Sequence, residues 1–120
     1  MSRRDAERLE DIRETCRKLA EIASAGRDAY DESWFMRDAA NYRLSILGEA
    51  LNGLSDEFVA RNPRIPVRAA KSLRNKLLHE YWEADPDILW DTITSDVPDL
   101  QSALEAAART PSGPEPPIGD

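Results

Sequence analysis

The sequence predicts an all-α fold, an up-and-down antiparallel bundle of four to five helices. Three observations support this prediction. Helix-forming residues such as Ala, Leu, Glu and Arg are abundant, whereas Thr, Val, Phe and Tyr are scarce. Apolar residues recur at spacings of three and four in several segments, and no segment has the pattern of a β-strand. The 120 residues are enough for one modest core but too few for two.

The first half of the chain contains two long predicted helices. The first runs from about residue 3 to residue 25 and should end at Gly26. Ser33 is a suitable N-cap for the second, which should end near Asn52 and Gly53. Apolar residues occupy much of the circumference of this second helix, so we expect it at the centre of the bundle. The apolar stripe of the first helix consists of Leu9, Ile12, Cys16, Leu19 and Ile22.

Proline and capping residues set the next boundaries. Ser55 can cap a short helix, which the Asn62-Pro63 step should end. Pro66 suits the first turn of a following helix. That helix would carry residues 67 to about 81.

The C-terminal part contains one further helix and a tail. Asp85-Pro86 should open the helix, and the segment 96–98 should restart it before its apolar stripe continues to Ala107. We expect residues 1–109 to form one helical domain. Residues 110–120 contain four prolines and almost no apolar side chains, so we expect them to form a flexible tail.

Bulk composition argues against several functional classes. A net charge of −7 disfavours a protein that coats nucleic acid non-specifically. The sequence has no apolar run long enough to span a membrane and no signal peptide, so we expect a cytoplasmic protein without membrane association. Cys16 and His79 are the only residues of their kinds, which excludes an internal disulfide and makes a zinc site within one chain implausible. We therefore expect no metal and no cofactor, and Cys16 should be a small buried apolar residue.

One segment reverses the overall negative charge. No acidic residue lies between Glu57 and Glu80. The basic residues of this interval are Arg61, Arg64, Arg68, Lys71, Arg74 and Lys76. The interval leads into the octapeptide RNKLLHEY, residues 74–81, which contains the single histidine of the chain.

In a helix, the polar residues of this interval gather on one side. At about 100° per residue, Arg68, Asn75 and His79 lie within a band about 60° wide, with Lys71 beside it. Arg74 and Tyr81 lie together on one edge of the helix. A histidine near its ordinary pKa is a natural general acid or base, and an arginine binds phosphate bidentately. His79 and Arg74 could therefore serve RNA cleavage without a metal.

The single histidine leaves two catalytic arrangements open. If two imidazoles share the acid and base roles, the site must form where two copies meet around a two-fold axis, which predicts a homodimer. Alternatively, one His79 acts with water or Tyr81 as the second group. A third interpretation involves no chemistry, because a basic helix face is commonly only solvated and Asn75 could simply fix the tautomer of His79.

Four segments in order resemble a known family. The spacing of Arg74, His79 and Tyr81 is similar to the R-x4-6-H-x-Y motif of HEPN domains, specifically that of the HepT-like ribonuclease toxins. The other three resemble the family's hydrophobic-GEA segment, its IP step before the motif helix and its W…P-x-L helix. In this chain they are Ile46-Leu47-Gly48-Glu49-Ala50, Arg64-Ile65-Pro66, and Leu89-Trp90 through Val97-Pro98-Asp99-Leu100.

The resemblance implies a homodimeric, metal-independent endoribonuclease. Arg74 and His79 of both protomers would line a composite cleft, with Asn75 positioning the RNA. From their place on the basic face of the helix, we expect Arg68 and Lys71 to position the RNA as well. The resemblance also implies a type VII-like toxin-antitoxin system, in which a minimal nucleotidyltransferase antitoxin transfers AMP to Tyr81. Appended adenylates would add negative charge and bulk beside the basic cleft and so block RNA.

The sequence departs from the family pattern in three places. Val67 stands where many relatives have Trp, and Glu80 replaces a common Asp. Trp82-Glu83 follows the tyrosine where a smaller step is frequent, which puts antitoxin access to Tyr81 in doubt. The alternative function is a non-catalytic helical binding partner of a nucleotidyltransferase that uses the same polar face for docking.

Overall fold

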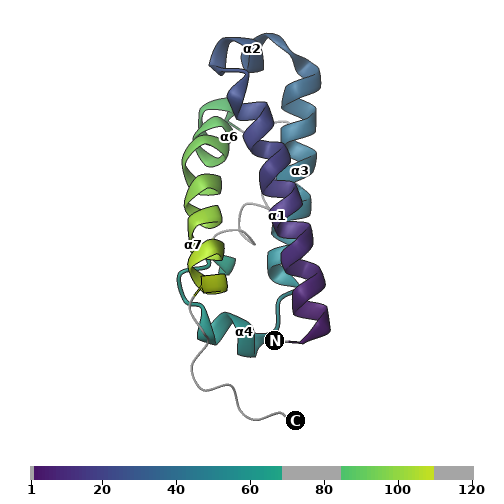
Figure 1. Ribbon diagram of the computed structural model, residues 1–120. Coiled ribbons are helices and arrows are strands. Elements are labelled where there is room, and N and C mark those ends of the chain that lie inside the picture. Colours follow the sequence, from purple (N-terminus) through teal and green to yellow (C-terminus); the bar gives the residue numbers. More distant parts are fainter. Residues whose placement is uncertain (1, 69–84, 110–120) are drawn as a thin grey trace.

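The computed structural model describes residues 2–68 and 85–109, and within these ranges every regular element is a helix. Helix α1 (Arg3–Ser24) and helix α3 (Trp34–Asn52) lie side by side and run in opposite directions (Figure 1). The short helix α2 (Arg27–Glu32) joins them at one end. Helix α4 (Asp56–Arg61) lies at the other end. The predicted all-α bundle is confirmed.

Local capping explains the boundaries of the first helices. The hydroxyl of Ser33 accepts a hydrogen bond from the Met36 backbone N–H at 3.2 Å, and Ser55 caps α4 in the same way through Phe58, also at 3.2 Å. Both caps were predicted. Gly26 ends α1 and has a φ of +90°, a conformation that favours glycine over residues with a side chain. Its ability to turn the chain here allows α2 to start at once.

The C-terminal helices form one continuous rod. Asp85 caps α6 (Pro86–Asp91) as predicted, accepting from the Asp87 N–H at 2.9 Å. The predicted restart at 96–98 is confirmed in position, because α7 (Val97–Arg109) begins at Val97. Helix α6 leads to it through a π-helical turn, η2 (Thr92–Asp96), without leaving helical geometry. Pro98 has no N–H for a normal helical bond, and its ring crowds the preceding turn. A widened turn just before it relieves this conflict.

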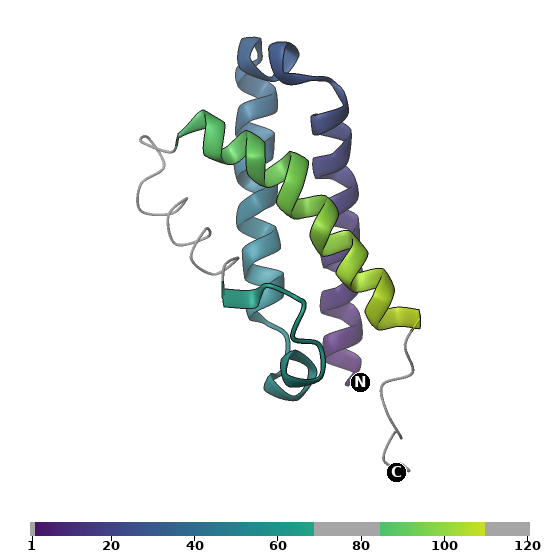
Figure 2. The ribbon, with the colours of Figure 1, turned by 90° about the vertical axis from the view of Figure 1, so that its left-hand side faces the viewer.

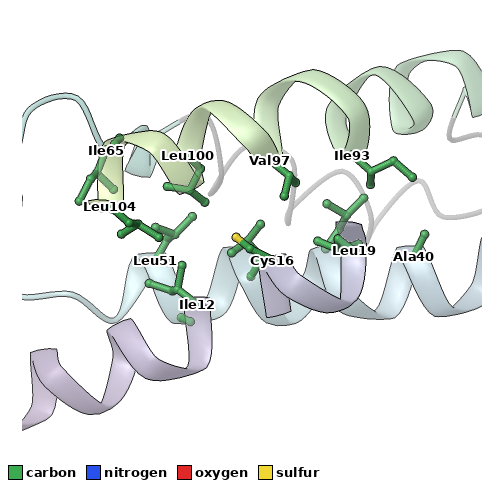
Figure 3. Packing of buried hydrophobic residues seen from close by; sticks show 14 of the residues in the cluster. Ile12, Cys16, Leu19, Ala40, Leu51, Ile65, Ile93, Val97, Leu100 and Leu104 are labelled. Carbon is green, nitrogen blue, oxygen red and sulfur yellow. The ribbon is translucent and has the colours of Figure 1, made fainter. Parts of the chain in front are cut away.

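The rod α6–η2–α7 crosses the α1 and α3 pair at an angle (Figure 2). Helix α1 contacts α3, η2 and α7, whereas the prediction that residues 34–52 form the central helix also concerns neighbours outside the described residues and stays a prediction. Figure 3 shows apolar side chains of the rod facing those of α1 and α3. The labelled residues of this layer are Ile12, Cys16 and Leu19 of α1, Ala40 and Leu51 of α3, Ile65, and Ile93, Val97, Leu100 and Leu104 of the rod.

The single cysteine belongs to this core. Cys16 is fully buried, and burial raises the pKa of its thiol to about 12. A thiol with so high a pKa stays protonated at neutral pH and is a poor nucleophile, so the predicted role of Cys16 as a small buried residue is confirmed. No group of three or more metal-ligating side chains occurs in the described ranges. None of the helices there is long and apolar enough to cross a membrane.

A buried carboxylate ties the start of α1 to the start of α4. Asp5 is 2% exposed, and its two oxygens accept hydrogen bonds from the backbone N–H of Ser55 at 2.8 Å and from its hydroxyl at 2.6 Å. Burial by itself would raise the pKa of Asp5, but its hydrogen bonds, first of all those from Ser55, together outweigh it, and the pKa lies below its ordinary value. The contact therefore depends on the ionised form of Asp5.

We predict that Asp5→Ala lowers the free energy of unfolding by about 1–3 kcal/mol at neutral pH, because it leaves the Ser55 donors without their buried partner. Urea denaturation of both proteins measures this difference. The control is Asp11→Ala on the exposed side of the same helix, which should change stability little. The prediction fails if the two variants are equally stable.

The same contact predicts a dependence on pH. The folded-state pKa of Asp5 is lower than its unfolded value, so its contribution is complete above the unfolded value and is lost as pH falls through the folded one. The stability difference between the parent protein and Asp5→Ala should accordingly shrink in acid. A difference that stays constant from neutral pH to pH values well below 3.8 would contradict this assignment.

Candidate functional site

Most of the predicted site residues lie outside the described part of the chain. Arg68 is described, and its side chain is exposed in the helical turn that begins after Pro66. Lys71, Arg74, Asn75, His79 and Tyr81 belong to residues 69–84, so their roles stay predictions. The structure does show how the protein holds the two ends of this segment.

The entry to the segment is fixed by apolar packing and a tight turn. Ile65 is buried in the core, and the partly buried side chain of Val67 packs against the same core. The N–H of Ile65 donates to the carbonyl of Asn62 at 3.0 Å, and the N–H of Val67 donates to the carbonyl of Ile65 at 2.9 Å. The IP step at Ile65-Pro66 thus serves as an anchor that sets where the following helix begins.

The exit from the segment is fixed by an ionic and aromatic cluster. Arg27 of α2 donates to Asp31 at 2.9 Å and to Asp87 of α6 at 2.5 Å. The ring of Trp90 lies 5.0 Å from the ring of Tyr30, measured between centroids, and the Arg27 guanidinium lies 6.0 Å from the Trp90 centroid. The carboxylates of Asp87 and Asp31 keep the pKa of Arg27 above its ordinary value.

Three exposed arginines lead into the segment along the chain, and Arg61, Arg64 and Arg68 are together called the basic strip here. None of the ion pairs between described residues involves them. By contrast, Arg17 and Arg27 are engaged with carboxylates. The strip therefore offers three guanidinium groups to an anionic ligand, at the end of the described chain where the predicted motif begins.

The opposite charge is concentrated on the rod. No Lys or Arg occurs from residue 85 to residue 108. Six carboxylates of this stretch are exposed: Asp85, Asp87, Asp91, Asp96, Asp99 and Glu105. The negative net charge of the protein thus does not extend evenly over its surface, and a polyanion would be repelled by the rod and attracted by the basic strip.

Sequence reasoning missed two features of the described residues. The Arg27–Asp87 pair joins residues 60 positions apart, and no local pattern marks such a pair. The second feature is that Trp34, Phe35 and Tyr42 of α3 are exposed, although they belong to the apolar pattern that defined this helix. Their spacing could have indicated a second apolar stripe, separate from the one that packs on α1.

The other segments of the family resemblance are mostly structural. Leu47, Gly48 and Ala50 lie in the buried part of α3, and Leu89, Val97 and Leu100 are buried residues of the rod. The predicted chemistry rests on the segment 74–81 and the basic strip, and the roles of these residues stay predictions.

Known proteins of one family are similar to this chain. The family model described as Ribonuclease HepT-like matches residues 12–107. A protein of Thermococcus cleftensis named probable ribonuclease HepT is 30% identical over 109 residues, which cover 88% of this chain and 96% of that protein. A protein of Methanocaldococcus jannaschii named putative RNase is 30% identical over 107 residues, covering 88% and 98%.

A protein of Caldanaerobacter subterraneus, also named putative RNase, is 34% identical over 62 residues, covering 52% of this chain and 55% of its own length. No solved structure matches the chain. The family match includes the basic strip and the whole segment 69–84, and two relatives align over nearly their full length. The chain belongs to the HepT-like ribonuclease family, as the order of its four motifs predicted.

Proposed function

We propose that this protein is a metal-independent endoribonuclease and the toxin of a type VII-like toxin-antitoxin system, with Arg74 and His79 as its catalytic residues. The observation that carries the proposal is the family match over residues 12–107, which includes the only histidine of the chain and the arginine five positions before it. Relatives that align over the same range are named as ribonucleases.

The proposed reaction needs three functions at one phosphodiester. A base removes the proton of the ribose 2′-hydroxyl, a cation stabilises the extra negative charge of the phosphorane, and an acid protonates the leaving 5′-oxygen. Imidazole serves as the acid or base, and the guanidinium of Arg74 stabilises the charge. A second imidazole has to come from a second copy, because each chain has one histidine.

The distribution of charge supports RNA as the ligand. The basic strip precedes the motif, and its arginines are not paired with carboxylates in the described ranges. Phosphate contacts of Arg and Lys provide much of the affinity for nucleic acid. The strip, which includes the positioning residue Arg68, would guide RNA together with Lys71 and Asn75 toward Arg74 and His79, while the acidic rod repels it.

The proposed regulation acts on the same segment. A minimal nucleotidyltransferase antitoxin transfers AMP from ATP to the hydroxyl of Tyr81, two residues after His79. Each adenylate brings a phosphodiester charge and a bulky base to the edge of the basic face. RNA phosphates are then repelled from the positions where they would bind.

Catalysis can be tested with purified protein and a fluorescent single-stranded RNA in the presence of EDTA. We expect the parent to cleave the RNA, and His79→Ala and Arg74→Ala to lose at least about a hundredfold in rate, the scale of general acid-base catalysis. Arg17→Ala removes an exposed arginine of α1 and serves as the control. Full activity of His79→Ala, or loss of parent activity in EDTA, would contradict the proposed mechanism.

The role of the basic strip can be tested by binding. The triple variant Arg61→Gln, Arg64→Gln and Arg68→Gln should bind single-stranded RNA more weakly, and the slope of log K against log salt should fall by about 0.7 for each phosphate contact removed. The matched control replaces Arg3, Arg4 and Arg17, which removes the same charge from α1. Equal affinity of the two triple variants would show that RNA binding depends on net charge and not on the position of the strip, which would contradict its role.

The regulatory proposal can be tested by intact-mass measurement after co-expression with a minimal nucleotidyltransferase from the same genome. We expect additions of AMP on the parent protein and none on Tyr81→Phe, because the acceptor hydroxyl is missing. The modified parent should also lose its ribonuclease activity. An unmodified parent protein would remove Tyr81 as the acceptor but would leave the proposed catalysis untouched.

A further inference from the structure

The first turn of α6 is attached to the rest of the protein on two sides. Leu89 is buried in the core, which holds one side of the turn. On the other side, the carboxylate of Asp87 accepts a hydrogen bond from the guanidinium of Arg27 at 2.5 Å. The backbone N–H of Asp87 donates to the carboxylate of Asp85 at 2.9 Å, so both the side chain and the backbone of Asp87 are held. Asp87 follows the segment 69–84 by three positions.

Arg27 is the residue at which these contacts meet. Its Nε donates to both carboxylate oxygens of Asp31, at 2.9 and 3.0 Å, while another nitrogen of the same guanidinium donates to Asp87. The guanidinium also lies beside the ring of Trp90, which packs on the ring of Tyr30. We define these five residues as the exit cluster. A planar guanidinium can hold two carboxylates and contact an aromatic ring at once, which the point charge of a lysine does not do.

The part of the exit cluster that belongs to α2 is itself fixed to the body of the protein. Tyr30 has no exposed surface. The guanidinium of Arg37, from α3, donates to the backbone carbonyls of Tyr30 and Asp31 at the end of α2. Helix α2 and the start of α6 lie at the same end of the molecule (Figure 1). The Arg27–Asp87 contact therefore places the start of α6 relative to α2 and α3.

Arg27 also holds together two groups that would otherwise repel each other. The carboxylates of Asp31 and Asp87 both lie within 3.0 Å of its guanidinium, although their residues come from different helices. Without the guanidinium, two like charges would face each other between α2 and α6. Loss of Arg27 thus replaces an attraction between the two helices by a repulsion.

A second arginine shows why the position of such a contact matters more than its strength. Arg17 also binds two carboxylates, those of Glu14 at 2.8 Å and Glu21 at 3.0 Å, but all three residues belong to α1. Ion pairs on the surface contribute little to the free energy of unfolding. The pairs of Arg17 join neighbours in one helix, whereas Arg27 joins two helices. Only the second kind of contact can set where one helix lies relative to another.

We propose that Arg27 and Asp87 are positioning residues of the ribonuclease, because their contact sets where the segment with the predicted catalytic residues must end. This inference rests on the proposed function and adds to it two residues outside the motif, neither of which needs to contact RNA. A misplacement of about 1 Å can lower a catalytic rate about a hundredfold. A contact that contributes little to stability can therefore be important for the rate.

The first test removes the carboxylate of Asp87 and leaves the Arg27–Asp31 pair of α2 in place. We expect Asp87→Ala to lower kcat at least about tenfold with KM nearly unchanged, because the lost contact does not bind RNA. Asp91→Ala is the matched control, since it removes the same charge from an exposed position of α6 that forms no ion pair with a described residue. Urea denaturation should show similar stability of both variants.

Equal kcat values of Asp87→Ala and Asp91→Ala would overturn the inference. So would a loss of activity in Asp87→Ala that follows a matching loss of stability, because the contact would then only support the fold. The KM readout separates the exit cluster from the basic strip. The triple variant of the strip should raise KM with little change in kcat, which is the opposite of the result expected for Asp87→Ala.

A double-mutant cycle tests whether the two residues act through one contact. Arg27→Met should also lower kcat, whereas Arg17→Met should not. The double variant Arg27→Met, Asp87→Ala should be no slower than Arg27→Met alone, because the contact is already lost and the repulsion between Asp31 and Asp87 is relieved. Effects on log kcat that simply add would show two independent roles and overturn the inference.

These outcomes are separate from those that test catalysis. If the parent cleaves RNA and His79→Ala does not, but Asp87→Ala and Asp91→Ala are equally active, only the inference about the exit cluster fails. If His79→Ala keeps full activity, the proposed mechanism fails whatever the Asp87 variants show. A parent protein without ribonuclease activity would overturn both.

Discussion

Burial of the apolar stripe of α1 is the constraint on which the rest of the described structure depends. Ile12, Cys16 and Leu19 have no exposed surface, because α3 lies along α1 and the rod α6–η2–α7 crosses the pair. Removing this layer from water provides the main driving force for folding. It also fixes the direction of the rod and of α3. The other contacts described above join helices that this layer packs together.

The two anchors of the motif segment are extensions of that layer. Ile65 joins the core just before Pro66, and Leu89 joins it just after the N-terminus of α6. The ionic cluster of Arg27 and Asp87 then ties the start of the rod to α2. The fold thus holds residues 65–68 and 85–90 in place on either side of the segment 69–84, to which the predicted catalytic residues belong. Charge follows the same division, with the basic strip before the segment and the acidic rod after it.

The π-helical turn keeps the apolar residues of the rod on the side that faces the core. In a regular α-helix, the four-residue steps from Leu89 to Ile93 and from Ile93 to Val97 would rotate the apolar stripe away from α1. The wider turn of η2 takes more residues per revolution, so Ile93 and Val97 both stay buried. The hydroxyls of Thr92 and Thr94 donate to the carbonyls of Ile88 and Trp90, each four residues earlier. Helical geometry therefore continues through η2 into the α-helix that begins at Val97.

What the sequence by itself determined about this protein was local. Caps at Ser33, Ser55 and Asp85 and the glycine at position 26 set the helix boundaries, because each acts on a backbone group within three residues. The four motif segments likewise needed only their order along the chain, and together they predicted the family. Tertiary structure alone decided which of two apolar stripes on α3 is buried. It also paired Asp5 with Ser55, 50 residues away, and Arg27 with Asp87, 60 residues away. Such outcomes depend on which surfaces meet after the helices pack, and helical periodicity is the same for a stripe that faces the core and one that faces solvent.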